Sequence, residues 1–406
     1  MRAETPPSAG QAAVRPWLDA AATRRANWAL ALVGFACFTL LYGTQPLLPQ
    51  LTGAFAISAV TASLSVSAGT AAMAFLLIPW SLLSDRYGRV ALMRACLFGA
   101  AIFGFASAFA PDFPTLLLSR VCVGACIAGV PAAAMAYLGE ELAPDQRARA
   151  MGLYIAANAL GGMSGRFLAA AVSEYLSWRH GLAALGLLGL LAAAGFLRLL
   201  PRGSHFVAQP LQLRPLFADV RNIYADAGLP WLFWIAFLIM GAFVGIYNYL
   251  GFRLSLPPYA LGPAVIGAIF LLYALGSLSS LLAAGAAARH GRQRVILAMS
   301  LCMAAGIGLT CFTPLPLIIG GLALFTFGYF AVHSLASAWV GRRAGTRRGL
   351  VSALYLSSYY LGGSVIGYAA GWPWEHFAWP GVVGALLLPV ALVIAITLHL
   401  RKLGDA

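Results

Sequence analysis

The sequence predicts an all-α membrane protein in which twelve transmembrane helices form two six-helix bundles. Three observations predict this fold class: a composition that is 61% hydrophobic with a mean hydropathy of +0.84, repeated apolar stretches of about 20 residues, and arginines gathered between those stretches. Each stretch is long enough to cross a bilayer core of about 30 Å as a helix. A β-barrel would need short strands of alternating apolar and polar residues, and the sequence lacks that pattern.

The twelve predicted helices follow one another through short connections, except near the middle of the chain. They cover residues 28–48, 62–83, 91–110, 114–138, 149–172, 181–200, 229–251, 264–288, 295–312, 316–340, 349–371 and 380–399. The longest polar interruption separates the sixth helix from the seventh. We therefore predict an N-terminal bundle over 28–200, a linker over 201–228 and a C-terminal bundle over 229–400, with tails at 1–27 and 401–406.

The net charge of +14 reflects membrane topology and not a nucleic-acid partner. If the amino terminus is cytoplasmic, all but four of the 26 Lys and Arg residues fall in the tails, the linker, the loops on the cytoplasmic side or the ends of the spans beside those loops. The exceptions are Arg120, Arg166, Arg179 and Arg253. This distribution follows the positive-inside rule and predicts that both ends of the chain are cytoplasmic.

The first 27 residues and the cysteines carry no sign of an export signal or a metal site. A cleaved signal peptide is the alternative for the first 27 residues, but the span that follows is too long for one and no cleavage site is evident. We expect a cytoplasmic tail. All six cysteines fall within predicted spans, where we expect small buried side chains and neither disulfides nor metal ligands.

The two halves of the sequence repeat one another. The segment LYIAANALGG at 153–162 parallels LYLSSYYLGG at 354–363, an offset of 201 residues. The same offset carries Trp178 onto Trp379, and tryptophan is rare in this chain. Parallel repeats with a binding site between them are an architecture of secondary transporters.

The stretch SDRYGRVALMR, residues 84–94, concentrates four charged side chains between the second and third predicted spans. Asp85, Arg86, Gly88 and Arg89 in it resemble the signature loop of the major facilitator superfamily, although Val90 stands where a second basic residue is usual. Members of this superfamily consist of parallel repeats. The resemblance implies the major facilitator fold.

Other motifs are similar to those of the same superfamily. The stretch RVCVG places Arg120 and Gly124 at two positions of a fourth-helix motif, and QPLLP places Pro46 and Pro49 at a first-helix motif. The stretches AMAYLGEE, NALGGMSGR and HSLASAWVG resemble a bacterial inner-membrane subgroup of efflux-type carriers. This resemblance implies a multi-pass protein of the bacterial inner membrane that exports a small molecule in exchange for protons.

The fifth-helix motif of proton-coupled drug exporters occurs only in altered form. Gly161, Gly162 and Gly165 match its spacing, but Gly162 replaces a proline and Arg166 replaces the last glycine. These departures weaken the similarity to drug antiporters. The small residues still predict close packing of this helix against a neighbour.

Arg120 and Arg166 are the two charged residues that the spans hold at depth. A charge at a helix centre costs about 2.5–3.5 kcal/mol on insertion scales, so each needs a reason to be there. We expect one or both to face a central cavity, where they attract an anionic group or regulate the binding of a proton. Alternatively, each binds backbone carbonyls or pairs with Glu174 or Asp112 near the outer surface.

Polar and aromatic residues at mid-membrane predict a binding site for a modest organic molecule. In the superfamily, the cavity is lined by residues of several spans, and the candidates that this mapping gives here are Tyr42, Gln45, Arg120, Asn158, Arg166, Tyr247, Asn248, His333, Tyr355 and Tyr359. Packing between helices is the alternative for the aromatic residues, and a structural hydrogen bond is the alternative for the two asparagines.

The residue that would carry a coupled proton is not obvious, because no carboxylate lies deep in a span. The candidates are Arg120, His333, Glu140 and Glu141. His333 is equally compatible with a structural bond to a neighbouring carbonyl. For Glu140 and Glu141, a solvated cytoplasmic pair is the stronger interpretation.

The signature loop predicts a cytoplasmic gate formed by Asp85, Arg86, Gly88 and Arg89. By resemblance, Asp85 closes this gate against the start of the eleventh helix, near Arg347 and Arg348. The alternative is a solvated loop that only fixes topology.

These observations together predict a secondary active transporter that works by alternating access, with proton-coupled efflux as the first expectation. Uptake or exchange of a small organic anion is the alternative, and a non-transporting sensor on a carrier fold is more remote. The sequence has no motif of a membrane-embedded enzyme and no ATP-binding loop. We expect no cofactor, a proton gradient as the energy source, and a protein that functions as a monomer.

Overall fold

The computed structural model describes residues 17–201, 203, 205–209 and 213–402. Over these ranges the chain is helical without a β-strand, and twelve helical stretches are long and apolar enough to cross a membrane. This confirms the predicted fold class. Most of the predicted amino-terminal tail, parts of the linker and most of the carboxyl-terminal tail lie outside the described residues.

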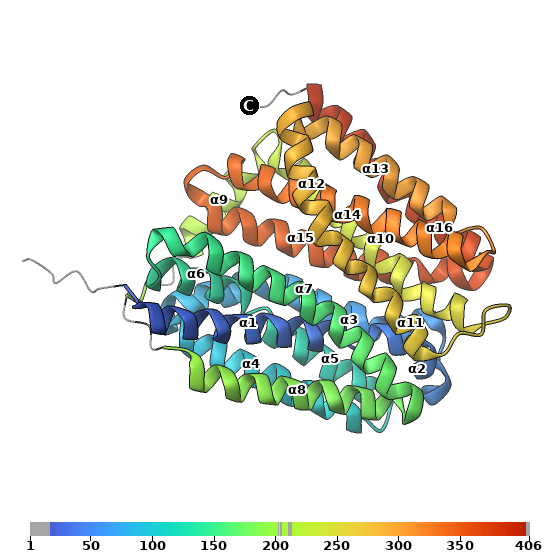
Figure 1. Ribbon diagram of the computed structural model, residues 1–406. Coiled ribbons are helices and arrows are strands. Elements are labelled where there is room, and N and C mark those ends of the chain that lie inside the picture. The colour runs from blue at the N-terminus through green and yellow to red at the C-terminus, as the bar shows by residue number, and fades with distance from the viewer. Residues whose placement is uncertain (1–16, 202, 204, 210–212, 403–406) are drawn as a thin grey trace, which may run out of the picture.

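The first half forms one bundle, drawn from blue to green in Figure 1. Its elements are α1 (Ala20–Tyr42), the 3₁₀ helix η1 (Gln45–Leu47), α2 (Leu48–Phe55), α3 (Ala59–Tyr87), α4 (Arg89–Ala106), η2 (Ser107–Phe109), α5 (Phe113–Ile127), α6 (Pro131–Glu141), α7 (Pro144–Tyr175) and α8 (Trp178–Leu199).

The second half forms the other bundle, drawn from yellow to red beside the first (Figure 1). Helix α9 (Leu213–Tyr224) lies within the segment predicted as the linker. The bundle follows with α10 (Leu229–Ser255), α11 (Pro263–Ile269), η3 (Phe270–Tyr273), α12 (Ala274–His290), α13 (Arg292–Leu309), α14 (Leu315–Arg343), η4 (Gly345–Arg347), α15 (Arg348–Ala369) and α16 (Gly371–Lys402).

Several spans that were predicted as single helices contain a break. The span predicted over 28–48 turns into η1 just before Pro46, and the span predicted over 114–138 is divided between α5 and α6 at Pro131. Proline has no N–H to donate and its ring crowds the preceding turn, so an ideal helix cannot continue through it. Helix α16 contains a non-helical residue, Ala378, two positions before Pro380 and thus ahead of the span predicted over 380–399.

The sequence repeat is visible in how the helices pack. A side chain at Gly161 of α7 would lie 2.1 Å from the backbone oxygen of Phe35 in α1. At the repeated position, a side chain at Gly362 of α15 would lie 1.9 Å from the backbone oxygen of Phe237 in α10. Only glycine allows backbones to approach so closely. The small residues of the altered fifth-helix motif therefore serve close helix packing.

The two bundles meet along two pairs of helices, α3 with α15 and α7 with α11. We call the side where α9 and the ends of α3 and α6 lie the linker face, and the side where α2 and the start of α11 lie the opposite face (Figure 1). Helix α1 runs from the linker face to the opposite face. Any solute that crosses the protein between the bundles has to pass from one of these faces to the other.

The cysteines only partly follow the prediction. Cys37 and Cys96 are buried, whereas Cys311 is exposed in the turn after α13. The reason is that α13 ends at Leu309, earlier than the predicted span. All six are free thiols, and the described residues contain no group of side chains that could hold a metal ion.

Candidate functional site: a polar and aromatic cluster between the bundles

A polar centre forms around Arg166 of α7, where the bundles meet in the half of the protein toward the opposite face. The guanidinium Nε donates to Oε1 of Gln45 at 2.7 Å, and Nη1 donates to the backbone oxygen of Gly162 at 2.6 Å. The ring of Tyr42 lies 4.2 Å from the guanidinium carbon. Arg166 is 3% exposed. A buried cation is tolerated here because hydrogen bonds and an aromatic face replace its water.

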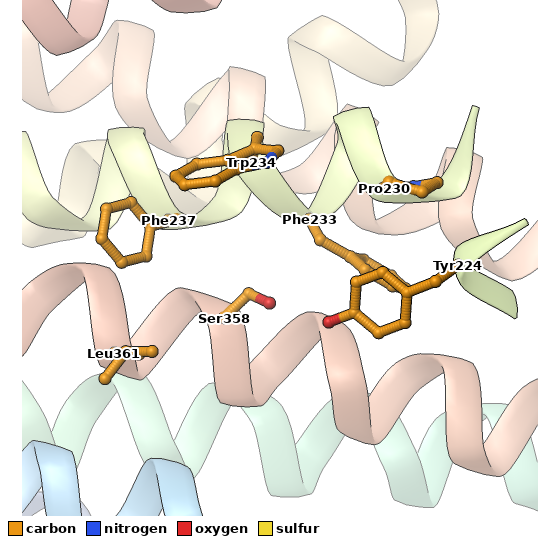
Figure 2. Close-up of a pocket in the computed structure, with 7 residues that line it drawn as sticks. All are labelled: Tyr224, Pro230, Phe233, Trp234, Phe237, Ser358 and Leu361. Atoms are coloured by element: carbon orange, nitrogen blue, oxygen red, sulfur yellow. The ribbon is translucent and has the colours of Figure 1, made fainter. Parts of the chain in front are cut away.

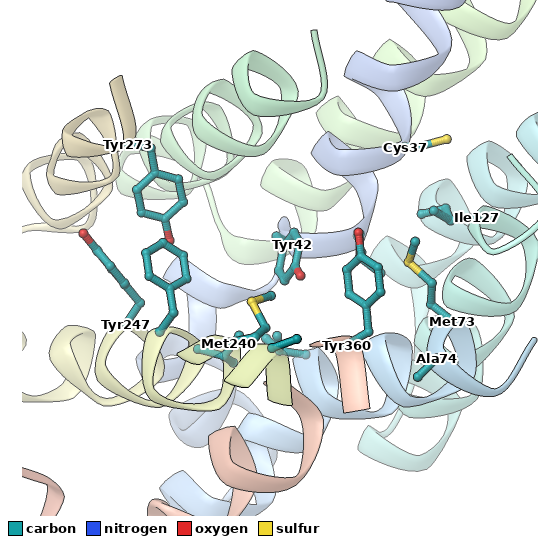
Figure 3. Packing of buried hydrophobic residues seen from close by; sticks show 14 of the residues in the cluster. Cys37, Tyr42, Met73, Ala74, Ile127, Met240, Tyr247, Tyr273 and Tyr360 are labelled. Atoms are coloured by element: carbon teal, nitrogen blue, oxygen red, sulfur yellow. The ribbon is translucent and has the colours of Figure 1, made fainter. Parts of the chain in front are cut away.

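The second bundle completes this centre. Gln45 donates through Nε2 to Oδ1 of Asn248 in α10 at 2.8 Å, which joins the bundles directly. The rings of Phe270 and Tyr273 lie 5.3 and 5.0 Å from the guanidinium carbon of Arg166. Figure 3 shows Tyr42 of the first bundle beside the second bundle, with Tyr273 and Tyr247 farther to its left. The structure thus brings together five of the sequence candidates: Tyr42, Gln45, Arg166, Tyr247 and Asn248.

Aromatic side chains of the second bundle continue from this centre. Tyr247 stacks on Phe270 at 5.2 Å and shares a hydrogen bond with Thr326 at 2.8 Å. Phe243 stacks on Tyr329 at 3.9 Å. These groups form one continuous aromatic wall on one side of the interface.

A second layer, nearer the linker face, surrounds His333 of α14. Its Nδ1 lies 3.2 Å from the hydroxyl of Tyr355, and its ring lies 4.6 Å from that of Tyr359. The hydroxyls of Tyr359 and Tyr329 share a hydrogen bond, which links this layer to the aromatic wall. The three sequence candidates from α14 and α15 are therefore in mutual contact.

Several buried polar atoms at the interface have no hydrogen-bond partner in the described structure. They include the hydroxyls of Tyr42 and Tyr273. Oδ1 of Asn158 is also without a partner, but it lies inside the first bundle, against Gly34 of α1. Buried polar atoms are nearly always paired in folded proteins, and an unpaired one costs about 1–3 kcal/mol. Such atoms are candidates for contacts with water or with a bound solute.

Arg120, the other buried arginine among the cavity candidates, lies apart from this centre, within the first bundle. It is 1% exposed and donates to three backbone oxygens of its own bundle: Leu40 at 2.7 Å, Ser65 at 3.3 Å and Leu41. Two of these oxygens lie near the end of α1, where the following break leaves carbonyls without helical partners. The structure therefore favours the alternative in which Arg120 binds backbone carbonyls.

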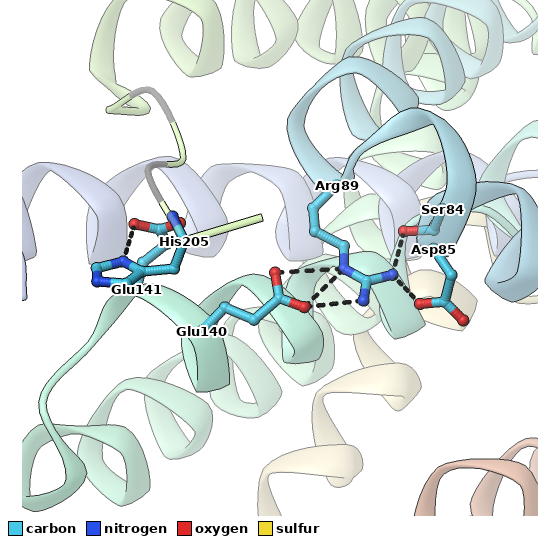
Figure 4. A network of polar contacts seen from close by, with 6 residues as sticks. All are labelled: Ser84, Asp85, Arg89, Glu140, Glu141 and His205. Atoms are coloured by element: carbon cyan, nitrogen blue, oxygen red, sulfur yellow. Dashed lines mark hydrogen bonds and ion pairs between the residues drawn. The ribbon is translucent and has the colours of Figure 1, made fainter. Parts of the chain in front are cut away.

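The signature loop forms a charged network at the linker face (Figure 4). Arg89 pairs with Asp85 four residues earlier, with Glu140 at 2.8 Å, and with the hydroxyl of Ser84 at 3.1 Å. Gly88 connects α3 to α4 with φ at +101°, a conformation that favours glycine. Arg86 points its guanidinium to the ring of Tyr87 instead of joining the network.

The two glutamates that end α6 are not the solvated pair that the sequence favoured. Glu140 is held by Arg89, and the side chain of Glu141 is only 1% exposed. Glu141 accepts from the backbone N–H of His205 at 2.8 Å and lies 3.0 Å from its ring nitrogen. The sequence could not show this, because the linker residue that covers Glu141 lies more than sixty positions away.

The expected contact between Asp85 and the start of the eleventh helix is not formed in this conformation. Asp85 faces Arg89, and Arg347 pairs with Asp219 of α9 at 2.8 Å. A neighbouring pair joins Arg343 of α14 to Asp226 at 3.1 Å. Partial burial raises the pKa of Asp226, but hydrogen bonds from Arg343 and from two backbone N–H groups outweigh it, and the net pKa is below its ordinary value.

Sequence reasoning missed several residues of the aromatic wall, among them Phe243, Phe270, Tyr273 and Tyr329. Tyr273 and Phe270 lie in η3, and a regular helix drawn through this span does not predict which way they point. A count of aromatic residues in the seventh, eighth and tenth spans would have been the available signal.

A separate pocket opens between α10 and α15 near the linker face (Figure 2). Its lining is Tyr224, Pro230, Phe233, Trp234, Phe237, Ser358 and Leu361. The volume is about 190 Å³, below the roughly 300 Å³ of typical ligand pockets, and the lining carries no charge. It shares no residue with the central cluster.

Comparisons with known proteins agree with this architecture. Residues 30–367 match the model of the Major Facilitator Superfamily. The chain is 41% identical to the inner membrane transport protein YnfM of Escherichia coli over 381 residues, 93% of this chain and 91% of that protein. It is 38% identical to the uncharacterized MFS-type transporter YybF of Bacillus subtilis over 379 residues, 93% of this chain and 94% of that protein.

Solved structures share the fold at low sequence identity. A bacterial homolog of the human lysosomal transporter Spinster superposes with a TM-score of 0.73 at 16% identity, covering 95% of this chain and 96% of that one. The nucleoside transporter NupG superposes with a TM-score of 0.74 at 14% identity, covering 93% and 100%. The twelve spans, the repeated bundles and these relatives make the chain a multi-pass membrane transporter and not an enzyme, and it belongs to the Major Facilitator Superfamily.

Proposed function

We propose that this protein is a secondary active transporter that moves a small organic solute across the cytoplasmic membrane by alternating access, with proton-coupled export as its mode. The linker face is cytoplasmic in this proposal, and both termini lie on that side. Arginines at the loops of the linker face support this orientation through the positive-inside rule. No cofactor takes part, a proton gradient supplies the energy, and the monomer is the working unit.

The observation that carries the proposal is the cluster at the bundle interface. Arg166, Gln45 and Tyr42 of the first bundle meet Asn248 and Tyr273 of the second, and buried polar atoms among them have no partner in the described structure. Transporters built from two repeats bind solutes at such an interface, because rocking of the bundles then exposes the same groups to either side. Aromatic faces beside a cation suit an organic molecule with both apolar and polar parts.

Export receives support from partial relatives. The chloramphenicol resistance protein CraA of Acinetobacter baumannii is 29% identical over 226 residues, 51% of this chain and 53% of that protein. The antiporter QDR3 of Candida albicans is 28% identical over 172 residues, 41% of this chain and 24% of that protein. Resistance and antiport, as these names state them, are both consistent with export in exchange for protons.

His333 is the proton-coupling residue in this proposal. No Asp or Glu lies deep in a span, whereas His333 lies within α14 of the second bundle and contacts Tyr355 and Tyr359. Imidazole titrates near neutral pH in water, and a change of protonation beside a chain of tyrosine hydroxyls alters which of them donate.

An organic anion is the second candidate substrate, because the buried guanidinium of Arg166 has no carboxylate among its contacts. Its hydrogen bonds go to an amide and a backbone carbonyl, both neutral. A carboxylate, sulfonate or phosphate on the solute would supply the missing negative charge through charge-assisted bonds.

The experiment that tests the function is solute counterflow in proteoliposomes. Purified protein is first screened for thermal stabilisation by drugs, sugars and organic acids, and each stabilising compound is then tested for flux. If export is in exchange for protons, an imposed pH gradient drives the solute against its own concentration gradient. His333→Gln then removes the pH dependence of solute flux but leaves solute counterflow. Equal flux with and without the gradient would refute proton coupling while leaving the carrier assignment intact.

Arg166 distinguishes the two substrate classes. Arg166→Gln abolishes stabilisation by acidic compounds only, if the solute is an anion. Arg120→Lys serves as the matched control, because it also alters a buried arginine but lies outside the interface. Absence of flux for every compound that binds would contradict the transport proposal itself.

A further inference from the structure

A glutamate of the first bundle caps a helix of the second bundle at the opposite face. Glu174, near the end of α7, accepts from the backbone N–H of Ala264 at 2.6 Å through Oε2. Ala264 lies in the first turn of α11, and Gly262 before it offers no side-chain cap. The first N–H groups of a helix have no partner within it and carry a partial positive charge. The carboxylate therefore supplies from the other bundle a cap that α11 lacks.

The second bundle returns the same contact. Glu375, near the start of α16, accepts from the backbone N–H of Val60 in the first turn of α3 through Oε1 at 3.4 Å. Residue 375 is the position that the sequence repeat assigns to residue 174, by the same 201-residue offset that relates Trp178 to Trp379. Helices α3 and α11 begin the second span of each repeat. The two contacts are thus equivalent helix caps, related by the pseudo-symmetry of the two repeats.

We propose that Glu174 and Glu375 form a symmetric pair of latches that hold the bundles together at the opposite face, and that these latches set the balance between the two access states of the transporter. Both are positioning residues, because they lie outside the central cluster and act through the helices that they cap. The inference rests on alternating access, as the proposed function does, but it does not depend on the identity of the solute.

The position of the latches fits this role. Other hydrogen bonds between the bundles, among them Gln45 to Asn248 and Ser364 to the backbone oxygen of Ser67, also lie toward the opposite face. The structure therefore holds the bundles closed there. Opening at this face has to separate α7 from α11 and α3 from α16, so both latches break in the same motion.

The two latches differ in strength. Helix α3 already has Ser58, whose hydroxyl accepts from Thr61 at 3.2 Å, whereas α11 has Glu174 alone. The contact of Glu174 is also the shorter of the two. A charge at an exposed helix terminus changes an equilibrium by about 2- to 5-fold. We expect Glu174 to lie near the upper end of that range and Glu375 near the lower end.

The experiment measures the opening directly by double electron–electron resonance. Spin labels replace Phe109 and Phe312, exposed side chains in opposite-face turns of the first and second bundle, in a protein without other cysteines. The full chain is reconstituted in nanodiscs. Glu174→Ala increases the long-distance population by about 3- to 5-fold, Glu375→Ala by about 2-fold, and the double variant by roughly their product.

Asp112→Ala is the matched control. Asp112 also caps a helix through a backbone N–H, that of Thr115 at 2.8 Å, but both residues belong to the first bundle. Its loss leaves the distance between the bundles unchanged. If the double glutamate variant gives the same distances as the Asp112→Ala protein, the latch proposal is wrong.

A second variant breaks the Glu174 latch from the other bundle and keeps the carboxylate. A side chain at Gly262 would lie 2.9 Å from Oε1 of Glu174, so Gly262→Ala has to displace the glutamate. The backbone of Gly262 has φ of −68°, which alanine adopts without strain. Gly262→Ala therefore matches Glu174→Ala in the distance measurement. These distances are measured without a solute. The latch proposal is therefore tested independently of whether a transported compound is found.

Discussion

Arg120 and Arg166 are two buried arginines of the same bundle, and their surroundings are opposite in kind. Every hydrogen bond of Arg120 goes to a backbone oxygen of its own bundle. Arg166 also bonds within its own bundle, to Gln45 and to the backbone oxygen of Gly162, but two of its three aromatic neighbours come from the other bundle. In the alternating access proposed above, the contacts of Arg120 stay within one bundle, whereas the contacts of Arg166 with the rings of Phe270 and Tyr273 have to change. The comparison teaches that burial of a charge in a span does not by itself make the residue a candidate for transport, and that the partners of the charge separate the two arginines.

The largest expected effect is on folding, at Arg120. Arg120→Leu leaves three buried carbonyls without their hydrogen-bond donor. Because each unsatisfied group costs about 1–3 kcal/mol, we expect the free energy of unfolding to fall by on the order of 3 kcal/mol or more. Detergent-solubilised protein measures this as a lower melting temperature and a smaller monodisperse peak. Transport for each folded molecule stays within about twofold. If Arg120→Leu has normal stability but no longer transports, the assignment of Arg120 to packing is wrong.

The next effect is on transport, at Arg166. Arg166→Gln keeps an amide for Gln45 but removes the charge, and a hydrogen bond to a charged group contributes about 1.5–3 kcal/mol, or roughly 10- to 100-fold in solute affinity. Counterflow at several solute concentrations measures it, while the melting temperature changes little. Arg166→Lys is the control that retains the charge. If Arg166→Gln transports normally and melts early, Arg166 belongs with Arg120.

A smaller effect is expected where the two bundles join beside Arg166. Asn248→Leu removes the bond from Gln45 and shifts the access balance by about 2- to 10-fold, the equivalent of a neutral hydrogen bond of about 0.5–1.5 kcal/mol. Alkylation of a cysteine placed at the opposite face reports the shift. Unchanged alkylation would mean that Gln45 and Asn248 bond equally well in both access states.

The smallest effect concerns an arginine outside the buried centre, Arg343. Its partner Asp226 has a pKa below the ordinary value of 3.8. As the pH falls, the carboxylate of Asp226 is therefore protonated at a higher pH in the unfolded chain than in the folded protein. The pair therefore contributes stability above pH 3.8, and the contribution is lost as the pH falls through the lower folded pKa. Since Asp226 is partly exposed, the contribution is about 1 kcal/mol or less.

Melting curves across the acid range test this sign. The parent protein melts above Arg343→Gln at neutral pH, and the difference shrinks below pH 3.8. A difference that grows on acidification would contradict the assignment.

The sequence predicted the spans and the repeat well, because both depend on local patterns. Apolar length gives the twelve helices, and the shared segment around Gly161 and Gly362 foretold two helix pairs that pack alike. The site was predicted in part. The candidates Gln45, Arg166 and Asn248 are linked by hydrogen bonds, as expected for residues of one binding site. Arg120 does not join them, and Tyr273 was not among the predicted residues. Which way a side chain points depends on helix breaks and rotations that apolar periodicity does not encode.

By itself the sequence determined that this chain crosses a membrane twelve times, that its halves share one plan, and that its arginines favour one side. Those properties follow from the composition of each segment, and from the need of backbone N–H and C=O groups inside a bilayer to be hydrogen-bonded to one another. Only the tertiary structure decided which buried arginine serves packing and which serves the interface. It also revealed that Glu174 and Glu375 each reach across to the other bundle. Contacts between residues many positions apart depend on how the helices are assembled, and that is set by packing over the whole molecule.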